Sequence, residues 1–262
     1  MPSRREQKIL RALSRRKGRE RHGLFLAEGP HLIAELADSE VEVELVLHAG
    51  DFPSEPEERR SLERLSERGA ELREVDAGTL EEFADTVTPQ GVLAAARIPA
   101  REPEELPDGG LLVLDAVQDP GNLGTLLRTA EAMGLAGVIS LPGTVDPWNP
   151  KALRAAAGST FRVPVFDADW EEARDRLRER DVEVWAADPL GEPVYGGGAA
   201  PERLALVLGN EGSGVSRAVL EDAHRRVRVP TAGSVESLNV AVAGALLVDR
   251  IFGLRAAAGT GA

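Results

Sequence analysis

The chain has 262 residues, 42% of them hydrophobic, so it can bury the core of one large or two small domains. It has no cysteine, which excludes disulfides and thiolate metal sites, and its four histidines lack metal-ligand spacing, so we expect no metal. No apolar run is long enough to cross a bilayer and no signal-peptide pattern opens the chain, so we expect a soluble, cytoplasmic protein with no membrane partner.

Charge is unevenly distributed along the sequence. The whole chain carries a formal net charge of −13, which argues against a general polyanion binder. Residues 1–22 nevertheless hold nine lysines and arginines against two acids, a local charge of +7 that leaves −20 on the rest. A basic arm on an acidic body is typical of nucleic-acid-binding proteins, although a solvated helix face would have the same composition.

The first part of the chain alternates between predicted helices and strands. Hydrophobic spacing predicts helices over 4–17, 31–37, 57–68 and 79–85, and strands over 24–27, 43–47, 72–75 and 92–98. Pro30 suits the first turn of the second of these helices. The alternation predicts a small α/β domain over residues 1–98 that includes the basic arm.

Residues 99–110, PAREPEELPDGG, are rich in proline, glutamate and glycine, so we expect a linker. After it, strands are predicted over 111–114, 137–141, 163–166, 182–187, 204–208 and 227–229, with helices over 123–133, 151–157 and 170–180. The continuous apolar run at 111–114 is typical of a buried parallel strand. We therefore expect a parallel-sheet α/β domain over 111–262, with ligands at the carboxyl ends of its strands.

Residues 227–252, VRVPTAGSVESLNVAVAGALLVDRIF, join a short strand, a turn-rich loop and an apolar helical segment. Small residues on several sides let such a helix lie close to other backbone, and Gly253 is placed to end it. Ser237 and Asn239 are polar residues at the mouth of this segment. They fit either a functional site or ordinary capping, with Ser237 as the N-cap and Asn239 on the surface.

Two further loops follow predicted strands. In residues 115–128, Asn122 can cap the next helix, and Arg128 lies about one and two-thirds turns further on. A capped helix with a solvated arginine would explain this loop equally well. Residues 206–214, LVLGNEGSG, place Glu211 among three glycines that let backbone approach a ligand. This loop lacks the P-loop ending and the dinucleotide spacing, which disfavours an ordinary nucleotide-dependent enzyme.

Three ordered motifs carry a family resemblance. Asn122 with Arg128, then Gly209-Asn210-Glu211-Gly212, then Ser237-Leu238-Asn239 resemble the signature motifs of the SpoU (TrmH-like) RNA ribose 2′-O-methyltransferases of the SPOUT superfamily. The stretch from Asn149-Pro150-Lys151 to Gly158, with Arg154, is also similar, and the resemblance covers about residues 111–254. The front sequence LFLAEGPHLIAELA resembles, more loosely, the ribosomal-protein-L30e-like substrate-binding domain of many members.

The resemblance implies the fold, the cofactor and the assembly. The C-terminal parallel-sheet SPOUT domain would contain a deep trefoil knot, behind a small N-terminal α/β domain of L30e type. It would bind S-adenosyl-L-methionine in a bent conformation and form a homodimer whose active site is completed across the subunit interface. The positions carried over for the cofactor pocket are Leu208, Gly209, Val229, Pro230 and Leu238.

The resemblance also implies a catalytic set: Asn122, Arg128, Glu211, Ser237 and Asn239. Arg128 would lie closest to the ribose hydroxyl. Because an arginine stays protonated up to a pKa above about 12, we interpret it as orienting the RNA phosphate and stabilising the developing alkoxide. Asn122, Ser237 and Asn239 would hold the ribose and Arg128, while Glu211 would fix its loop by accepting backbone or arginine donors.

We therefore expect S-adenosylmethionine-dependent methylation of a ribose 2′-hydroxyl in structured RNA. The L30e-like front favours ribosomal RNA by analogy. Two alternatives remain open: a transfer RNA methyltransferase of the same kind, and a non-catalytic RNA-binding protein with a degenerate knot. The five intact polar residues argue against the second alternative. Binding of S-adenosylmethionine, but not of ATP or NAD, would separate these hypotheses from an ordinary nucleotide-dependent enzyme.

Overall fold

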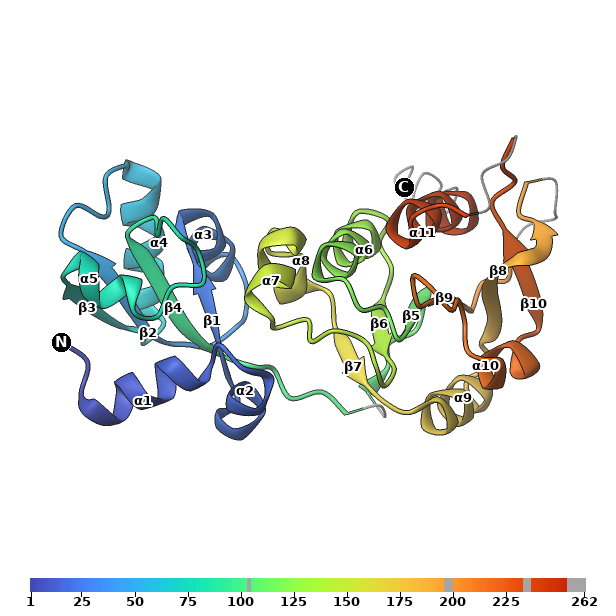
Figure 1. The fold of residues 1–262 in the computed structure, drawn as a ribbon, viewed down its shortest axis with the longest axis horizontal. Helices are drawn as coiled ribbons and strands as arrows, with labels where there is room; N and C mark the ends of the chain where they lie inside the picture. The colour runs from blue at the N-terminus through green and yellow to red at the C-terminus, as the bar shows by residue number, and fades with distance from the viewer. Residues whose placement is uncertain (103–104, 196–199, 233–236, 254–262) are drawn as a thin grey trace. The chain divides into compact units, whose positions relative to one another are not determined.

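The computed structural model describes residues 1–102, 105–195, 200–232 and 237–253 (Figure 1). Its internal contacts divide the chain into two compact units. The first unit is Met1–Ala100 with Asp146–Arg162, and the second is Arg101–Val145 with Val163–Ala262. Among the described residues, no helix is long and apolar enough to cross a membrane.

The sheet of the first unit has the strand order β1-β4-β2-β3. The strands are β1 (Leu24–Glu28), β2 (Val43–Ala49), β3 (Glu71–Val75) and β4 (Val92–Arg97). β4 is antiparallel to both β1 and β2, while β3 runs parallel to β2. Successive side chains point to opposite faces, so Phe25 enters one core cluster while Leu24 and Leu26 enter the other.

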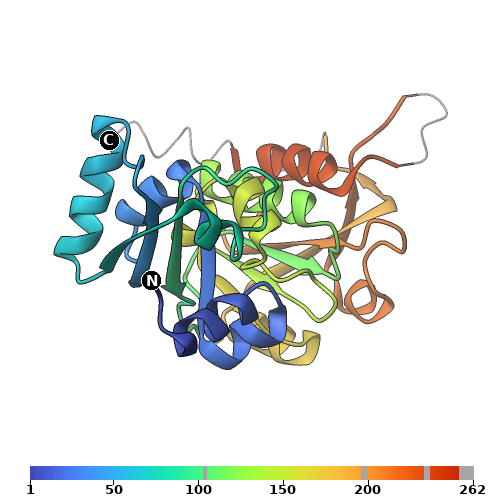
Figure 2. The same cartoon turned by 60° about the vertical axis from the view of Figure 1, so that its left-hand side comes forward.

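Helices cover both faces of this sheet (Figure 2). On the Phe25 side lie α3 (Pro30–Ala37), α4 (Pro56–Glu67), α7 (Pro150–Ala156) and α8 (Ser159–Arg162). On the other side lie α1 (Arg4–Ala12) and α5 (Ala77–Glu81), and α2 (Arg16–His22) contacts α1 and β1. The short helix α8 was not expected from the sequence.

The helix predicted over residues 4–17 is two helices, and the predicted basic arm is part of a folded unit. A Cβ on Gly18 would lie 1.9 Å from the carbonyl oxygen of Ala12, so only glycine fits where α2 begins against the end of α1. Leu10 and Leu13 are buried in the core. Arg19 is 2% exposed, pairs with Asp146 at 2.5 Å, and donates to the carbonyl of Leu13 at 2.8 Å. The arm expected from composition is therefore a rigid layer of the first unit.

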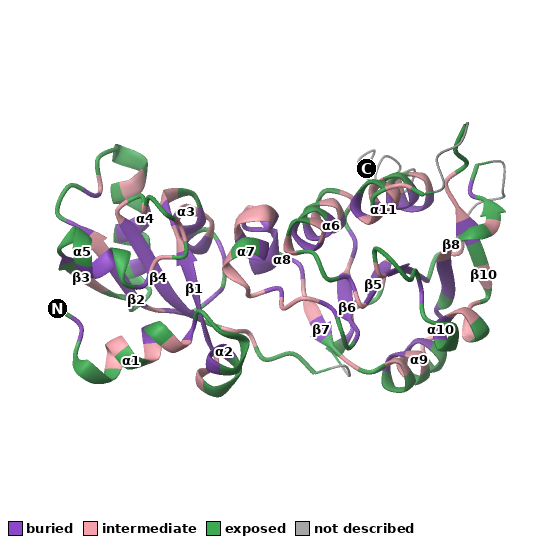
Figure 3. Ribbon diagram, in the orientation of Figure 1, coloured by how far each residue is buried: buried purple, intermediate pink, exposed green. Residues whose placement is uncertain are grey.

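The second unit contains six parallel strands in the order β10-β8-β9-β5-β6-β7. They are β5 (Leu111–Asp115), β6 (Gly137–Ser140), β7 (Val165–Asp167), β8 (Glu183–Pro193), β9 (Leu204–Gly209) and β10 (Arg225–Arg228). Every residue of β5, β6 and β9 is buried (Figure 3), as parallel strands covered on both faces should be. The predicted parallel α/β domain is confirmed.

The helices of the second unit lie on the two faces of this sheet. α6 (Pro120–Ala132) and α11 (Val240–Val248) pack together on one face, and α9 (Trp170–Glu179) and α10 (Arg217–Asp222) lie on the other (Figure 1). α11 continues into a π-helical turn, η2 (Asp249–Gly253). A Cβ on Gly244 would lie 2.5 Å from Leu126 and 2.6 Å from Leu208, so α11 makes the close approach that its small residues predicted.

Sequence patterns missed three features of the second unit. α10 and η2 were not expected, because both are short and mix apolar with charged residues. β8 runs to Pro193, beyond the predicted end at residue 187. Its register with β10 changes from Ala186↔Arg226 to Glu192↔Val227, which leaves residues 187–191 as a bulge.

One segment departs from the predicted domain boundaries. Residues 146–162 connect β6 to β7, yet Leu153 and Phe161 belong to the first unit's core. The ring of Phe25 lies 4.7 Å from that of Trp148 and 5.7 Å from that of Phe161, measured between centroids. The sequence placed this segment in a domain over 111–262, because a contact with Phe25 leaves no local pattern.

Candidate functional site

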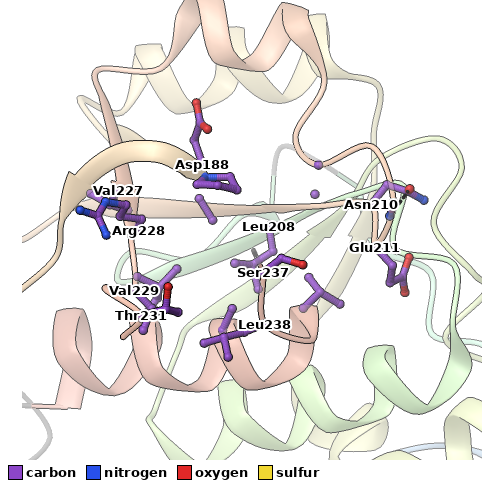
Figure 4. Close-up of a pocket in the computed structure, with 18 residues that line it drawn as sticks. Asp188, Leu208, Asn210, Glu211, Val227, Arg228, Val229, Thr231, Ser237 and Leu238 are labelled. Carbon is purple, nitrogen blue, oxygen red and sulfur yellow. Dashed lines mark hydrogen bonds between the residues drawn. The ribbon is translucent and has the colours of Figure 1, made fainter. Parts of the chain in front are cut away.

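A cavity of about 240 Å³ lies at the carboxyl ends of the second unit's strands (Figure 4). Its walls come from the ends of β9 and β10, the bulge of β8, and the first turns of α11 with the residues before it. The carboxyl ends of parallel strands meet at one edge of a sheet, which explains why these segments converge.

Four of the five predicted cofactor residues line this cavity: Leu208, Gly209, Val229 and Leu238. Pro230, the fifth, is exposed and does not line it. Two predicted catalytic residues, Glu211 and Ser237, also line it. Four positions carried over from the family resemblance, together with Glu211 of the loop singled out over 206–214, thus lie in the wall of one cavity.

The loop after β9 folds back on itself, and this explains Gly209. Asn210 and Gly214 exchange two backbone hydrogen bonds of 3.0 and 2.9 Å. The Asn210 carboxamide accepts from the amide of Gly212 at 2.9 Å and donates to the carbonyl of Ala116 at 2.9 Å. A Cβ on Gly209 would lie 2.1 Å from the amide nitrogen of Val215. The protein's own backbone thus requires this glycine, whereas sequence analysis attributed the loop glycines to ligand approach.

Glu211 ties this loop to the first motif. Its carboxylate accepts from the amides of Gln118 at 3.1 Å and Asp119 at 3.0 Å, and from Nδ2 of Asn122 at 3.0 Å. Desolvation by burial would raise the pKa of Glu211, but the hydrogen bonds from Asn122, Asp119 and Gln118 outweigh it and hold the pKa below its ordinary value. The carboxylate therefore stays ionised near neutral pH and fixes both segments.

Asn122 and Asn239 join the first and third motifs. Nδ2 of Asn239 donates to Oδ1 of Asn122 at 2.9 Å, and Oδ1 of Asn239 accepts from the amides of Ala241 and Val242 at 2.9 and 3.2 Å. Asn239 is therefore the N-cap of α11, and the alternative with Ser237 as the cap is wrong. Asn122 is not a cap either.

Asp119 caps α6 instead, because Pro120 takes the first helical position. Its carboxylate accepts from the amide of Asn122 at 2.9 Å. The structure thus links Glu211, Asn122 and Asn239 into one hydrogen-bonded chain beside the cavity.

Arg128 and Ser237 stand outside this chain. Both are exposed, and neither side chain makes a hydrogen bond or ion pair with the part of the protein that the structure describes. Ser237 lines the cavity, while Arg128 is on α6 and does not. No residue that the structure describes bonds these two side chains, whereas the three linked ones bond one another.

Sequence reasoning missed Asp115, the last residue of β5. It is 7% exposed, and Oδ2 accepts from the amide of Ser216 at 2.6 Å, which anchors the far end of the loop after β9. The available signal was an acid that ends an otherwise apolar buried strand, LLVLD.

Substituting Glu211 by glutamine is expected to destabilise the second unit by about 1 kcal/mol at pH 7, because the ionised acceptor of three donors is lost. The folded-state pKa is lowered, so this stabilisation is present above the ordinary value of 4.5 and disappears as pH falls through the lowered value. Denaturant unfolding at pH 7 and at acid pH measures both. Glu221→Gln, which removes a surface ion pair with Arg217, is the control. A pH-independent difference between Glu211→Gln and the wild type would contradict the assignment.

Comparisons with known proteins agree with this geometry. The family model of the SpoU rRNA Methylase family matches residues 110–249, more than half of the chain. The model of the MRM3-like substrate binding domain matches residues 6–94.

Two curated relatives illustrate the match. The 23S rRNA (guanosine(2553)-2′-O)-methyltransferase RlmP of Bacillus subtilis is 38% identical over 243 residues, covering 92% of this chain and 93% of the relative. The 23S rRNA (guanosine-2′-O-)-methyltransferase RlmB of Salmonella typhi is 33% identical over 193 residues, covering 70% and 79%.

Solved structures share the fold. An RNA methyltransferase of the TrmH family from Porphyromonas gingivalis superposes with a TM-score of 0.84 at 33% identity, covering 95% of this chain and 98% of that one. The AdoMet-bound rRNA methyltransferase of Sinorhizobium meliloti gives 0.84 at 27% identity, covering 95% of each chain.

Proposed function

The chain belongs to the SpoU rRNA methylase family, and we propose that it transfers a methyl group from S-adenosylmethionine to a ribose 2′-hydroxyl of ribosomal RNA. The observation that carries the proposal is the convergence of all three motifs on one cavity edge through the chain Glu211–Asn122–Asn239. Ribosomal rather than transfer RNA is favoured by the names of the relatives and by the match to a substrate-binding domain.

The cavity suits the cofactor. Leu208, Val229 and Leu238 would hold the apolar part of the cofactor, and the backbone groups at the strand ends would be available to its polar atoms. S-adenosylmethionine, when bound, supplies a methyl group made electrophilic by the adjacent sulfonium charge. The protein's own contribution is then to position the ribose and to handle the hydroxyl proton.

Arg128 is the residue best suited to meet the RNA. Its guanidinium is exposed and unpaired among the described residues, so it can bind a phosphate and stabilise negative charge on the ribose oxygen. With a pKa above about 12 it cannot accept the hydroxyl proton. We assign the proton to an RNA phosphate oxygen held by Arg128.

The remaining polar residues divide into two groups. Ser237 lines the cavity, its hydroxyl is bonded by no described residue, and it can contact the ribose directly. Asn122 and Asn239 already bond each other, Glu211 and the first turn of α11, so we interpret all three linked residues as positioning residues. Their role is to fix the edge on which the ribose must lie.

Two measurements test the proposed function. Isothermal titration is expected to show binding of S-adenosylhomocysteine and no binding of ATP or NAD. Mapping of 2′-O-methyl groups in RNA from cells with and without the protein is expected to show loss of a ribosomal RNA site. Loss of a transfer RNA site instead would replace the substrate, and unchanged RNA with no cofactor binding would favour the non-catalytic alternative.

A homodimer is part of the proposal, as are a trefoil knot in the second unit and a cytoplasmic location. Val242 and Leu246 lie one turn apart on α11 and are 51% and 38% exposed. Exposed apolar side chains on one helix face favour contact with a second copy.

Changing Val242 and Leu246 together to glutamate is therefore expected to give a monomer by light scattering after gel filtration, because buried charge at an interface without a partner is strongly unfavourable. Leu190→Glu is the control, since this residue is 93% exposed on β8. A wild-type mass that equals one chain, or a double variant with the dimer's mass, would contradict the interface.

A further inference from the structure

Among the described residues, a group of cations on α1, on α2 and at Arg15, the N-cap of α2, has no acidic partner. Each is exposed, and none makes a side-chain hydrogen bond or ion pair within the described part of the chain. They are Arg4, Arg5, Lys8, Arg15, Lys17 and Arg21. Below, this group is called the α1–α2 cation face.

The nearby acids are committed elsewhere. Glu6 accepts from the amide of Ser3 and from Arg73, and the Arg73 hydrogen bond is the main cause that lowers the pKa of Glu6 to about 2. Glu20 pairs with Arg16 at 2.8 Å. Neither acid is therefore available to neutralise the face.

The cations of the face lack partners even though the chain as a whole has more acidic than basic residues. The chain has 44 acidic residues against 31 lysines and arginines. Within the same helices, Arg11 pairs with Glu82 at 2.5 Å, and Arg19 is buried against Asp146. The cations that are paired are thus interspersed with those that are not.

The arrangement of the face opposes helix stability. Arg4 with Lys8, and Lys17 with Arg21, are like charges four residues apart on one helix side. Each such pair costs about 0.2–0.5 kcal/mol in an isolated helix. An anionic ligand would remove this repulsion.

The face is held rigidly toward solvent. On α1 the opposite side carries Leu10, with Leu13 just beyond the helix end, and both are buried in the core. On α2 the buried residues are Gly18 and Arg19. Because the apolar side of α1 is already buried, it cannot insert into a membrane, as an interfacial amphipathic helix must.

We propose that the α1–α2 cation face binds the phosphate backbone of the RNA substrate. The inference rests on the proposed function for the identity of the RNA, and it adds the surface that holds the backbone. Contacts of this kind position the RNA without reading its sequence. They also explain how a chain with a net charge of −13 attracts a polyanion, since the unpaired cations are concentrated on two adjacent helices of one folded unit.

The test compares two variants that remove equal charge. The first is Arg4→Gln/Lys8→Gln/Lys17→Gln/Arg21→Gln. The control is Arg59→Gln/Arg60→Gln/Arg101→Gln/Arg178→Gln, at cations that are also exposed. Truncation of residues 1–22 would not serve, because it would remove Leu10 and Leu13 from the core.

Affinity for an in vitro transcribed ribosomal RNA fragment is measured by fluorescence polarisation between 50 and 200 mM salt. Each lost phosphate contact lowers the slope of log K against log salt by about 0.7 to 0.9, so the first variant is expected to lose about 3 in slope. At 0.1 M salt its affinity should fall roughly tenfold or more. The control should keep the wild-type slope, and both variants should bind S-adenosylhomocysteine as the wild type does. Arg5→Gln/Arg15→Gln, a milder change, should lose about 1.5 in slope.

Several outcomes would overturn the inference. One is an equal loss of RNA affinity and slope in the control variant, and another is an unchanged slope in the first variant. A third is a first variant that loses binding to phosphatidylserine vesicles while its RNA binding stays intact.

The proposed function can fail separately from this inference. If the wild type binds RNA with the expected slope but transfers no methyl group, the cation face stands and the enzyme assignment does not. If the wild type methylates RNA while the first variant keeps its slope, the enzyme assignment stands and the α1–α2 cation face is not an RNA-binding surface.

Discussion

Replacing Arg128 by alanine is expected to lower methyl transfer to RNA by about a thousandfold or more, while the Kd for S-adenosylhomocysteine changes by less than about threefold. Arg128 does not line the cavity, so its loss leaves the cofactor contacts in place. It is exposed and unpaired among the described residues, so its loss breaks no structural bond. A tritium transfer assay and isothermal titration measure the two quantities.

Two further variants sharpen this test. Arg128→Lys keeps the charge but loses the planar fork, so its activity should be intermediate if the guanidinium holds a phosphate through two donors. Arg217→Ala, at a side chain that is 90% exposed on α10, should retain wild-type activity. Wild-type turnover in Arg128→Ala would remove this residue from the catalytic assignment.

Gly209→Val is expected to weaken cofactor binding by about a hundredfold or more, equivalent to about 2.7 kcal/mol. The added side chain would occupy the position of the Val215 amide, 2.1 Å from the Cβ, and must displace the loop that carries Asn210 and Glu211. Stability of the second unit should also fall by about 1–3 kcal/mol, because the close contact is between backbone atoms. Isothermal titration with S-adenosylhomocysteine and denaturant unfolding measure these effects.

Gly212→Ala is the matched control for the loop after β9. A Cβ there would lie 3.5 Å from Oδ1 of Asn210, which is ordinary contact, so binding and stability should remain close to wild type. Unchanged cofactor binding in a folded Gly209→Val protein would mean that the cofactor occupies another part of the surface.

Local patterns predicted the strands well and the caps poorly. The buried parallel strand over 111–114 follows directly from its unbroken apolar run, and β5 extends it by one residue. The cap of α6 was misplaced on Asn122 although a signal was present. Pro120 fits the first helical position, and this makes Asp119 the cap. For α11, Ser237 and Asn239 are both good caps, and only the backbone geometry distinguishes them.

Contacts between distant segments could not be predicted from composition or spacing. Glu211 and Asn122 are 89 residues apart, and only the family resemblance placed them in one site. Charge counting over residues 1–22 suggested a basic arm typical of nucleic-acid-binding proteins, and the structure adds that Leu10 and Leu13 bury the segment's apolar side in a core. The helical spacing of those two leucines predicted the helix but not the core that it packs against.

The insertion of residues 146–162 into the first unit constrains how the protein is made. When the ribosome has synthesised the first hundred residues, Arg19 has its burial site but not Asp146, and Phe25 lacks both Trp148 and Phe161. A buried arginine without its carboxylate is strongly destabilising. The first unit therefore completes its core only after β5 and β6, two of the second unit's six strands, have been translated. A fragment that ends at the linker would lack the core contacts of Leu153 and Phe161, so we expect it to be less stable than the first unit in the whole chain.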